Sequence, residues 1–436
     1  MRDEELRQMF RSFAEPVARW AEPPDPRRIR TRGRRRRRNL LGGAMLAAVA
    51  LIVGAVGVRA GLLADSTPSV GQVASPTTLA APGPATTASA PSSTPPSTTL
   101  PLGKVTSLDA VQVTGPGSVV VVGKRAILAT TDSGRTWVRV WEGPGDLRDV
   151  NFSSASAGWA LGDGLVLATA DGGLHWGPLG EPAQGPLRRV HFVSRTEGWG
   201  VAGGADQAVE GPMVPTGATR LVHSVDGGRT WSAQAAPAPP QSVCFTSPAD
   251  GWLASGTRVW RSTDGGRSWG RKPSFTLPVD AGSPPFQAEL QCAEPAAAWV
   301  RFDGGGAAGH SPYALYTTRD GGGRWRGVLA EANTLSPRLR LPSGPGSTPG
   351  PFSVIDPTSA FLLSPTPAAN AVGGVLVEGE KFSVVSDIRG SFLSDSTSVS
   401  FASRTTGWAV GKDGAGRAVI LVTSDGGRRW SRQLRF

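Results

Sequence analysis

The chain is poor in the side chains that most often carry enzyme or metal chemistry. Its 436 residues include two cysteines, two tyrosines and four histidines. The histidines stand at positions 175, 191, 223 and 310, without the close spacing that is typical of metal ligands. No motif for a metal ion or an organic cofactor is present, so we expect the protein to hold neither.

Acidic residues are also in the minority, and the imbalance lies at one end of the chain. Lys and Arg number 45 against 34 Asp and Glu, a net charge of +11. Residues 1–38 contain 13 Arg against 6 acids, a net of +7, and Arg59 adds one, which leaves +3 for everything that follows. Nucleic-acid binding needs concentrated positive charge, so it is not expected of the larger, nearly neutral part.

What the sequence does contain is a pair of repeats. One motif occurs six times after residue 120: Thr or Ser, Asp two residues later, Gly two residues after that, and Trp three residues after the Gly. Its Asp and Trp residues are Asp132 and Trp137, Asp171 and Trp176, Asp226 and Trp231, Asp264 and Trp269, Asp320 and Trp325, and Asp425 and Trp430. A second motif, Gly-Trp or Ala-Trp, keeps step with the first, and Phe or Cys lies seven residues before each of its tryptophans. These tryptophans are Trp159, Trp199, Trp252, Trp299 and Trp408.

The spacing predicts how many units there are. The six aspartates are separated by 39, 55, 38, 56 and 105 residues. The last gap is close to two average units, so a degenerate copy is expected between 326 and 397, where Phe361 takes the Trp position and Val354 lies seven residues before it. Another diverged pair, Val119 with Gln112, begins the array. We therefore predict seven units of about 47 residues over 105–436.

Each unit reads as four short strands separated by turn residues. In one unit these runs are 191–193, 198–201, 221–223 and 230–233. Four antiparallel strands repeated around a ring are typical of a β-propeller. A β-sandwich would not repeat one hairpin motif six times. The predicted fold is therefore all-β, a seven-bladed β-propeller of four-stranded antiparallel blades.

The Asp-Gly-Trp motif has the composition that a tight hairpin needs. Gly after Asp supplies positive φ angles, and an Asp carboxylate accepts hydrogen bonds from backbone amides a few residues on. The Trp buries a large apolar surface, on the order of 150–250 Å². A propeller has one central site, so six equivalent carboxylates cannot all be catalytic. We interpret the twelve Asp and Trp residues as structural and assign no catalytic residue.

The run from Ser262 to Trp269, preceded by Gly251-Trp252, resembles the Asp-box, also called the bacterial neuraminidase repeat. In this pairing the chain is most similar to the photosystem II stability/assembly factor family. The resemblance covers nearly all of 105–436 and implies a seven-bladed propeller that acts as a non-catalytic assembly factor. The same repeats occur in sialidases, xyloglucan-cleaving glycosidases and sorting receptors, so a carbohydrate-active enzyme is the alternative.

The residues that such an enzyme would need are mostly missing. A sialidase requires a Tyr nucleophile, for which only Tyr313 and Tyr316 are available, and the Arg-Ile-Pro motif of sialidase domains is absent. An inverting glycosidase requires two facing carboxylates. Acids outside the boxes that could supply them are Asp163, Asp250, Glu294 and Asp303. Asp250 and Glu197 each precede a Gly-Trp pair, which favours a role in the turn between strands. We expect no enzyme activity.

Residues 40–58 form a 19-residue stretch without charge, about long enough to cross a bilayer as a helix. Arg34 to Arg38 directly precede it and only Arg59 follows closely, so the positive-inside rule places 1–38 in the cytoplasm and 60–436 outside. The arginine run would set this topology and attract anionic lipid. A cleavable signal peptide usually has shorter n- and h-regions, although Arg37 to Leu41 resembles a twin-arginine export signal. We predict an uncleaved signal anchor in a single-pass cell-membrane protein.

Two further segments flank this anchor. The linker after it is rich in Ser, Thr, Pro and Ala, a composition that cannot bury enough apolar surface to fold. Before it, 4–13 carries apolar residues at helical spacing, so 1–20 could either dock onto a cytosolic partner or lie on the membrane surface. The predicted domains are a cytoplasmic segment (1–38), the transmembrane anchor (39–60), a disordered linker (61–104) and the propeller (105–436).

The two cysteines fall in the first strands of successive blades, one position apart in register. Outside the membrane a disulfide could form. A one-residue offset between Cys244 and Cys292 would point their side chains to opposite sheet faces. This offset favours two buried thiols, with the disulfide as the alternative.

The predicted function is that of a scaffold. We expect the exported propeller to bind another protein, or a cell-wall glycan, without chemistry. The funnel face of the disc, where loops from all blades converge, is the expected binding surface. Its long insertions are 202–219, 302–312 and 331–350.

Overall fold

The computed structural model describes residues 100–162, 164–207, 214–273, 275, 277, 287–304, 311–331, 341–344, 348–366, 370–379, 381–389 and 393–436. The chain divides into two units, residues 1–92 and 93–436. The predicted cytoplasmic segment, the anchor and nearly all of the linker lie outside the described residues. None of the described residues belongs to a helix with the length and apolar character needed to span a bilayer.

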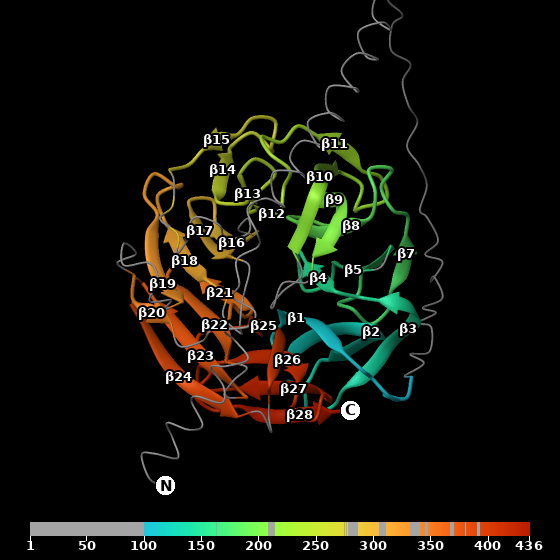
Figure 1. The fold of residues 1–436 in the computed structure, drawn as a ribbon. Coiled ribbons are helices and arrows are strands. Elements are labelled where there is room, and N and C mark those ends of the chain that lie inside the picture. The colour runs from blue at the N-terminus through green and yellow to red at the C-terminus, as the bar shows by residue number, and fades with distance from the viewer. Residues whose placement is uncertain are drawn as a thin grey trace, which may run out of the picture. The chain divides into compact units, whose positions relative to one another are not determined.

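The described strands form seven sheets, antiparallel apart from one short strand in blade 5, arranged as the blades of a ring (Figure 1). Blade 1 contains β1 (Leu108–Gly115), β2 (Ser118–Thr130) and β3 (Val138–Asp146). Blade 2 contains β4 (Asp149–Phe152), β5 (Gly158–Gly162), β6 (Leu165–Thr169) and β7 (Gly177–Leu179). Blade 3 contains β8 (Leu187–Phe192), β9 (Gly198–Gln207), β10 (Val214–Ser224) and β11 (Ser232–Gln234).

The other four blades repeat this order. Blade 4 contains β12 (Ser242–Phe245), β13 (Gly251–Ser255), β14 (Arg258–Ser262) and β15 (Gly270–Arg271). Blade 5 contains β16 (Gln287–Glu294), β17 (Ala297–Asp303), β18 (Tyr313–Thr318), β19 (Arg326–Glu331) and β20 (Ser343–Gly344). Blade 6 contains β21 (Phe352–Asp356), β22 (Ser359–Thr366), β23 (Ala371–Glu378) and β24 (Lys381–Arg389). Blade 7 contains β25 (Asp395–Phe401), β26 (Gly407–Lys412), β27 (Ala418–Thr423) and β28 (Ser431–Arg435).

The predicted seven-bladed propeller is confirmed, with two departures from four strands per blade. Blade 1 has three strands, because the long β2 pairs with β1 through residues 118–123 and with β3 through residues 124–129, and a single bridge joins Leu100 to Arg139 on β3. Blade 5 has a fifth strand, the short β20, which pairs with β19 in parallel. The degenerate unit is blade 6, in which Phe361 takes the place of the repeated Trp and is fully buried.

The register of the first two strands explains the Phe and Gly-Trp spacing. In blade 4, Phe245 on β12 lies directly opposite Gly251 on β13. A Cβ atom on Gly251 would come within 2.3 Å of the Phe245 ring, so only Gly leaves room for it. In blade 5 the opposed pair is Cys292 and Ala298, where a smaller side chain faces a methyl group. In these two blades, the size of the residue on the first strand is matched to the size of the residue opposite it on the second strand.

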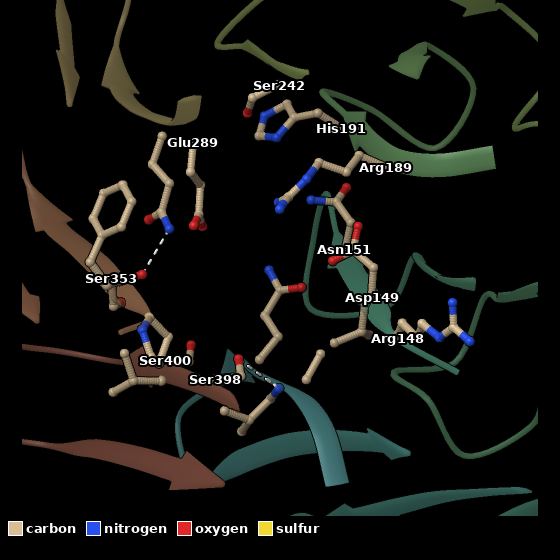
Figure 2. Close-up of a pocket in the computed structure, with 18 of the residues that line it drawn as sticks. Arg148, Asp149, Asn151, Arg189, His191, Ser242, Glu289, Ser353, Ser398 and Ser400 are labelled. Atoms are coloured by element: carbon tan, nitrogen blue, oxygen red, sulfur yellow. Dashed lines mark hydrogen bonds between the residues drawn. The ribbon is translucent and has the colours of Figure 1, made fainter. Parts of the chain in front are cut away.

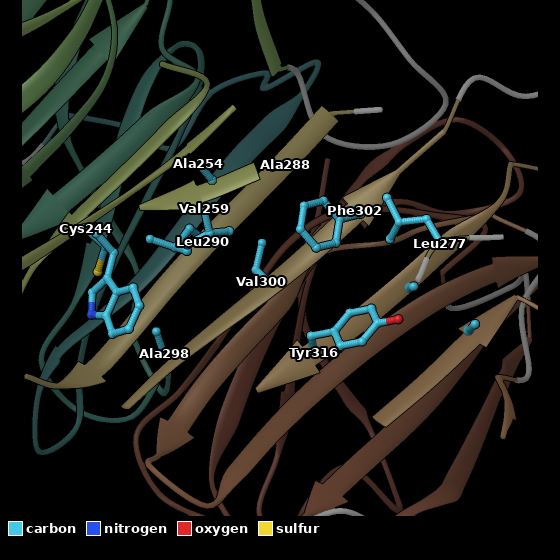
Figure 3. Close-up of a cluster of buried hydrophobic side chains, with 13 residues drawn as sticks. Cys244, Ala254, Val259, Leu277, Ala288, Leu290, Ala298, Val300, Phe302 and Tyr316 are labelled. Atoms are coloured by element: carbon cyan, nitrogen blue, oxygen red, sulfur yellow. The ribbon is translucent and has the colours of Figure 1, made fainter. Parts of the chain in front are cut away.

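The blades stack face to face through these aromatic side chains. Trp199 of blade 3 is fully buried, and its ring lies 3.6 Å from that of Phe245 in blade 4, nearly parallel to it. Trp159 stacks in the same way on Phe192, one blade earlier, at 3.5 Å. Apolar clusters fill the space between neighbouring blades, and Figure 3 shows the one between blades 4 and 5. Burial of these clusters is the main contribution to stability.

Connections alternate between the two faces of the ring because neighbouring strands are antiparallel. The turns from first to second and from third to fourth strand lie on one face, which we call the box face because the Asp-box motifs of blades 2, 3, 4, 5 and 7 lie there. The sixth motif, between β2 and β3 of blade 1, lies on the same face, because the Ser133 N–H donates to the Gly117 carbonyl in the β1–β2 turn. The other connections lie on the opposite face, which we call the insertion face because the described ends of the three predicted insertions lie there: 202–207 and 214–219, 302–304 and 311–312, and 331, 341–344 and 348–350. The first of these is not only a loop, since β9 and β10 extend into it and pair Gln207 with Val214.

Candidate functional site

Each of the six box aspartates is engaged within its own hairpin. In blade 4 the Ser262 hydroxyl donates to Asp264 Oδ1 at 2.8 Å, and the Ser268 N–H donates to the same oxygen at 2.9 Å. The Ser268 hydroxyl donates to Oδ2 at 2.5 Å, and the Gly266 N–H donates to Ser262 Oγ at 2.7 Å. In every box the carboxylate accepts a hydroxyl and a backbone N–H in this way. The arrangement is that of a staple which holds a tight turn closed.

These hydrogen bonds change the acidity of the box carboxyls. Hydrogen bonds from Thr136 and Thr130 lower the pKa of Asp132 to about 2, and those from Ser268 and Ser262 do the same for Asp264. The box tryptophans lie beside the same turns, and the Trp231 indole N–H donates to the Gly228 carbonyl at 3.1 Å. The six boxes stand at six separate hairpins, so they do not form a common site.

The other acids considered for catalysis are not brought together either. Asp250 forms an ion pair with Arg261 at 3.0 Å, and Glu197 contacts His223 Nε2 at 3.2 Å. Glu294 is exposed at the end of β16, and Asp303 is buried in blade 5. The remaining candidate, residue 163, lies outside the described residues.

Asp303 belongs to a buried ionic cluster between blades 5 and 6. Both its carboxylate oxygens accept hydrogen bonds from Arg301, at 2.8 and 2.9 Å, and the same guanidinium donates to Glu289 at 2.9 Å and to the Gly350 carbonyl. Arg301 is fully buried and lies over the Phe352 ring. Burial alone would lower the pKa of Arg301, but the charges of Asp303 and Glu289 raise it. Burial raises the pKa of Asp303, and the positive charge of Arg301 partly offsets that rise. Glu289 extends the cluster to the centre of the ring.

The centre of the ring is a channel with a volume of ≈ 770 Å³. Its wall is made by the innermost strands of the seven blades, β1, β4, β8, β12, β16, β21 and β25 (Figure 2). Three charged residues occupy equivalent positions near the starts of their strands: Asp149, Arg189 and Glu289. These strands start at the insertion face, so the charges lie toward that mouth of the channel. Figure 2 shows Arg189 and Glu289 reaching into it from different walls.

The charged residues at the channel mouth influence the pKa of Asp149. Burial raises the pKa of Asp149, and the nearby positive charge of Arg189 partly offsets that effect. Glu289 adds to the rise because a second negative charge disfavours ionisation of Asp149. Asp109 lines the same channel, and burial raises its pKa as well. The channel mouth therefore combines positive charge with carboxyls that bind protons more readily than usual.

Deeper in the channel, a ring of hydrogen bonds joins all seven blades. One side chain from each innermost strand bonds to the backbone of the next blade; these side chains are Gln112, Asn151, His191, Cys244, Gln291, Ser353 and Ser400. Their partners, in the same order, are the backbones of Phe152, Phe192, Phe245, Cys292, Val354, Phe401 and Val113. Six of these bonds run from a backbone N–H and measure 2.8 to 3.1 Å. We refer to the set as the acceptor ring.

The structure overturns the prediction that the two cysteines are buried thiols. Cys244 and Cys292 form a disulfide between blades 4 and 5, with a Cα–Cα distance of 6.0 Å. The two side chains do point to opposite faces of their own sheets. Adjacent blades stack face to face, however, so the front of one sheet packs against the back of the next. The one-residue offset is therefore what brings the two sulfurs together.

Each of the three described histidines contacts a different residue. His191 lies in the channel wall with Nε2 4.0 Å from Cys244 Sγ, and burial lowers the pKa of His191 to about 4. His175 takes the Thr position of its box and contacts Asp171 at 2.6 Å, and His223 stacks on Trp199. The fourth histidine, residue 310, lies outside the described residues.

Sequence reasoning missed the acceptor ring, although a signal for it exists. Six members lie eight residues before the repeated Trp or Phe361, directly before the residue that faces Gly or Ala. The seventh, Gln112, lies opposite Val120, and the residue after it, Val113, faces Val119. The predicted pair of Gln112 and Val119 is therefore wrong by one residue. The position is always polar or Cys, but it is filled by five different residue types. Because the residue type changes from blade to blade, the repeat was not recognised in the sequence.

Comparison with known proteins identifies similar folds but no close relative. No protein-family model and no curated protein matches the chain. Similar solved structures include YCF48 bound to D1 peptide, with a TM-score of 0.48 and 14% identity, which covers 76% of this chain and 99% of that one. YCF48 from Cyanidioschyzon merolae gives a TM-score of 0.37 and 14% identity over 77% and 87% of the two chains.

An ancestral GH74 enzyme gives a TM-score of 0.50 and 13% identity over 76% of this chain. The chain spans about half of that enzyme, 47% of its length. YCF48 is a photosystem II assembly factor, so the family that the repeats resemble is among the structural neighbours. At these identities the likenesses show the propeller fold alone.

Proposed function

We propose that the protein is a membrane-anchored, extracytoplasmic propeller that acts as a non-catalytic scaffold and binds a partner protein at the insertion face. The mouth of the central channel is the contact site. Charged side chains of both signs line it, and the described ends of the three long insertions belong to the same face.

The proposal is supported mainly by the layer of charged side chains at the channel mouth, formed by Asp149, Arg189 and Glu289. Small-molecule pockets are mostly apolar with a few polar groups, whereas this channel wall is dominated by polar and charged side chains. Complementary charges give specificity and fast association with a partner. A polypeptide segment with charges of both signs and free backbone groups fits such a wall.

The state of the carboxylates also supports a scaffold. The box aspartates each accept several hydrogen bonds at the hairpins, and Asp250, Asp303 and Glu197 each contact a basic side chain. YCF48 was solved with a bound D1 peptide, so a seven-bladed propeller can hold a peptide. For this chain, the charged wall of the channel supports peptide binding.

The alternative function is that of a carbohydrate-active enzyme, or of a cell-wall glycan-binding module. One observation favours it: Asp149 and Glu289 are two carboxyls in one channel, and the pKa of Asp149 is raised as that of a general acid would be. Against it, Glu289 is already paired with Arg301. A scaffold releases no sugar from polysaccharide, whereas an enzyme does so and loses the activity in Glu289→Gln.

The membrane part of the proposal rests on residues outside the described ones. The uncharged stretch 40–58 is the anchor, and the arginines before it hold 1–38 in the cytoplasm. The segment 1–20 would be available to a cytosolic partner. Protease added to intact expressing cells should digest the propeller and spare an N-terminal tag. Protection of the propeller in intact cells would contradict this topology.

The binding site is tested with full-length protein captured from detergent-solubilised membranes. Asp395 is exposed at the channel mouth, so Asp395→Lys changes the charge there without removing a buried contact. The matched control is Arg389→Glu on β24, whose side chain is 78% exposed on the rim of blade 6. A partner identified by mass spectrometry with wild type should be kept by the control and lost with Asp395→Lys. Equal recovery with both variants would place the site elsewhere.

A further inference from the structure

Three potential metal-binding side chains converge on one sector of the acceptor ring. The ligand atoms of His191, Cys244 and Cys292 all lie within 4.8 Å of one another. They come from β8, β12 and β16, the innermost strands of three successive blades, and all three residues line the channel. The five other members of the ring are amides and hydroxyls, so the soft donors are confined to this sector.

The donor set and its geometry match zinc. Two thiolates and one imidazole are ordinary Zn²⁺ ligands, with Zn–S about 2.3 Å and Zn–N about 2.0–2.1 Å. A tetrahedral ion with these bonds places sulfur about 3.6 Å from nitrogen and the two sulfurs about 3.8 Å apart. His191 Nε2 is 4.0 Å from Cys244 Sγ, and the cysteine Cα atoms are 6.0 Å apart. Side-chain rotation must separate the two sulfurs and bring the imidazole nitrogen a few tenths of an ångström closer to Cys244 Sγ.

We propose that the reduced cysteine pair and His191 form a Zn²⁺ site on the channel wall, and that oxidation to the disulfide closes this site. The fourth coordination position faces the channel and takes water. The Cys292 N–H already donates to Cys244 Sγ at 3.0 Å, a contact that stabilises a thiolate. The strand that carries Cys292 is also held from its other side, because Gln291 bonds to the backbone of Phe352 and Val354.

The interconversion is balanced with a dithiol as the reductant. The dithiol transfers two electrons and two protons to the Cys244–Cys292 bond, which yields two thiols and leaves the reductant as its own disulfide. Zn²⁺ then displaces one proton from each thiol, and neutral His191 contributes a nitrogen lone pair. Oxidation of the pair by another disulfide reverses the sequence and releases the ion.

Cobalt titration of the full-length protein tests the site. The protein is reduced with a phosphine, which does not compete as a thiol ligand, and Co²⁺ binding is followed through the thiolate-to-metal absorption bands. We expect one Co²⁺ per reduced chain, displaced by Zn²⁺, and none in the oxidised protein. No band in the reduced wild type, or an equal band in the oxidised protein, would overturn the proposal.

Ring variants identify the ligands without removing the fold. His191→Gln places at this position the amide that Gln112 and Gln291 carry in their blades. In the double variant Cys244→Ser, Cys292→Ser, the first substitution places the hydroxyl that Ser353 carries in its blade, and the second removes the other thiol. Because outer-sphere partners alone are worth about 10–100-fold in metal affinity, loss of the His191 ligand should weaken binding by more than about tenfold. The double variant should abolish the thiolate band.

The matched control is His175→Thr, which restores the usual residue of an Asp-box. His175 is exposed and lies between the outer strands of blade 2, away from the channel. It should bind Co²⁺ as wild type does. If His191→Gln also binds as wild type does, His191 is not a ligand and the proposed site is wrong. Circular dichroism of each variant, which should match wild type, separates loss of a ligand from loss of the fold.

Discussion

The hydroxyl of Ser400 in the last blade accepts a hydrogen bond from the backbone N–H of Val113 in the first, at 3.1 Å, and joins residues 287 positions apart. Among the described strands none is exchanged between these two blades, and side-chain hydrogen bonds and packing join them. Ser398 accepts from Val111 in the same way, and Trp408 packs in a cluster with Val111 and Trp137. The junction depends on contacts that form only after both ends of the domain have folded.

We predict that Ser400→Ala weakens this junction. The substitution leaves the Val113 N–H without its acceptor, and a lost neutral hydrogen bond costs about 1 kcal/mol. Denaturant unfolding of the purified protein measures the change in free energy of unfolding. Ser424→Ala is the control, because Ser424 is exposed and the equivalent residue in the second box is Ala170. An equal effect of both substitutions would mean that the hydroxyl at 400 does not contribute to closure.

The disulfide is expected to be a larger contribution. It closes a loop of 48 residues, for which the chain-entropy treatment gives an upper limit of about 4 kcal/mol. Reduction should therefore lower the free energy of unfolding by about 2–4 kcal/mol. The measurement is guanidinium unfolding with and without a phosphine reductant, in metal-free buffer. The double variant Cys244→Ser, Cys292→Ser should show the lower stability in both conditions; a response of that variant to the reductant would point to another cause.

Features that depend on residues close together in the sequence could be predicted. Phe245 and Gly251 are six residues apart and repeat in other blades, so local spacing was enough to find the strands and count the blades. The box hydrogen bonds, such as that from Ser268 to Asp264, span only four residues.

Contacts between blades follow no such local pattern. The pairing of Cys244 with Cys292 depends on which face of one sheet meets which face of the next, and the strand register alone led to the wrong choice. The charged level of Asp149, Arg189 and Glu289 was missed for the same reason, because positions that are 40 and 100 residues apart become neighbours only in the ring.

The match between Phe and Gly within a blade gives a prediction about packing. Gly251→Ala places a methyl group against the Phe245 ring, 2.3 Å from its nearest atom, and overpacking of this kind costs about 1–3 kcal/mol. Ala298→Gly in blade 5, where the facing residue is Cys292, should cost only about 0.5–1 kcal/mol through chain flexibility. Thermal or denaturant unfolding measures both.

A double-mutant cycle shows whether the contact is the cause. Phe245→Val reproduces the Val354 and Ala360 pair of blade 6. In the Phe245→Val background the additional cost of Gly251→Ala should largely disappear, because residues in contact are not additive. An unchanged cost would mean that the backbone of Gly251, rather than the ring, limits the substitution.

The box carboxyls predict how stability depends on pH. The pKa values of Asp132, Asp226 and Asp264 are lowered to about 2 from an ordinary value near 4. Between pH 4 and 2 the unfolded chain therefore binds more protons at these groups than the folded one. Their contribution to stability is complete above about pH 4 and is lost as the pH falls through about 2.

A single box variant isolates this effect. Asp264→Asn removes the charged acceptor of the Ser268 and Ser262 hydrogen bonds, so its melting temperature should lie below that of wild type at pH 7. The gap should narrow as the pH falls from 4 toward 2, because protonation deprives the wild type of the same charge. Asp387→Asn, at an exposed position on β24, is the control and should follow the wild type throughout. A gap that stays constant across this range would mean that Asp264 stabilises its hairpin without depending on its charge.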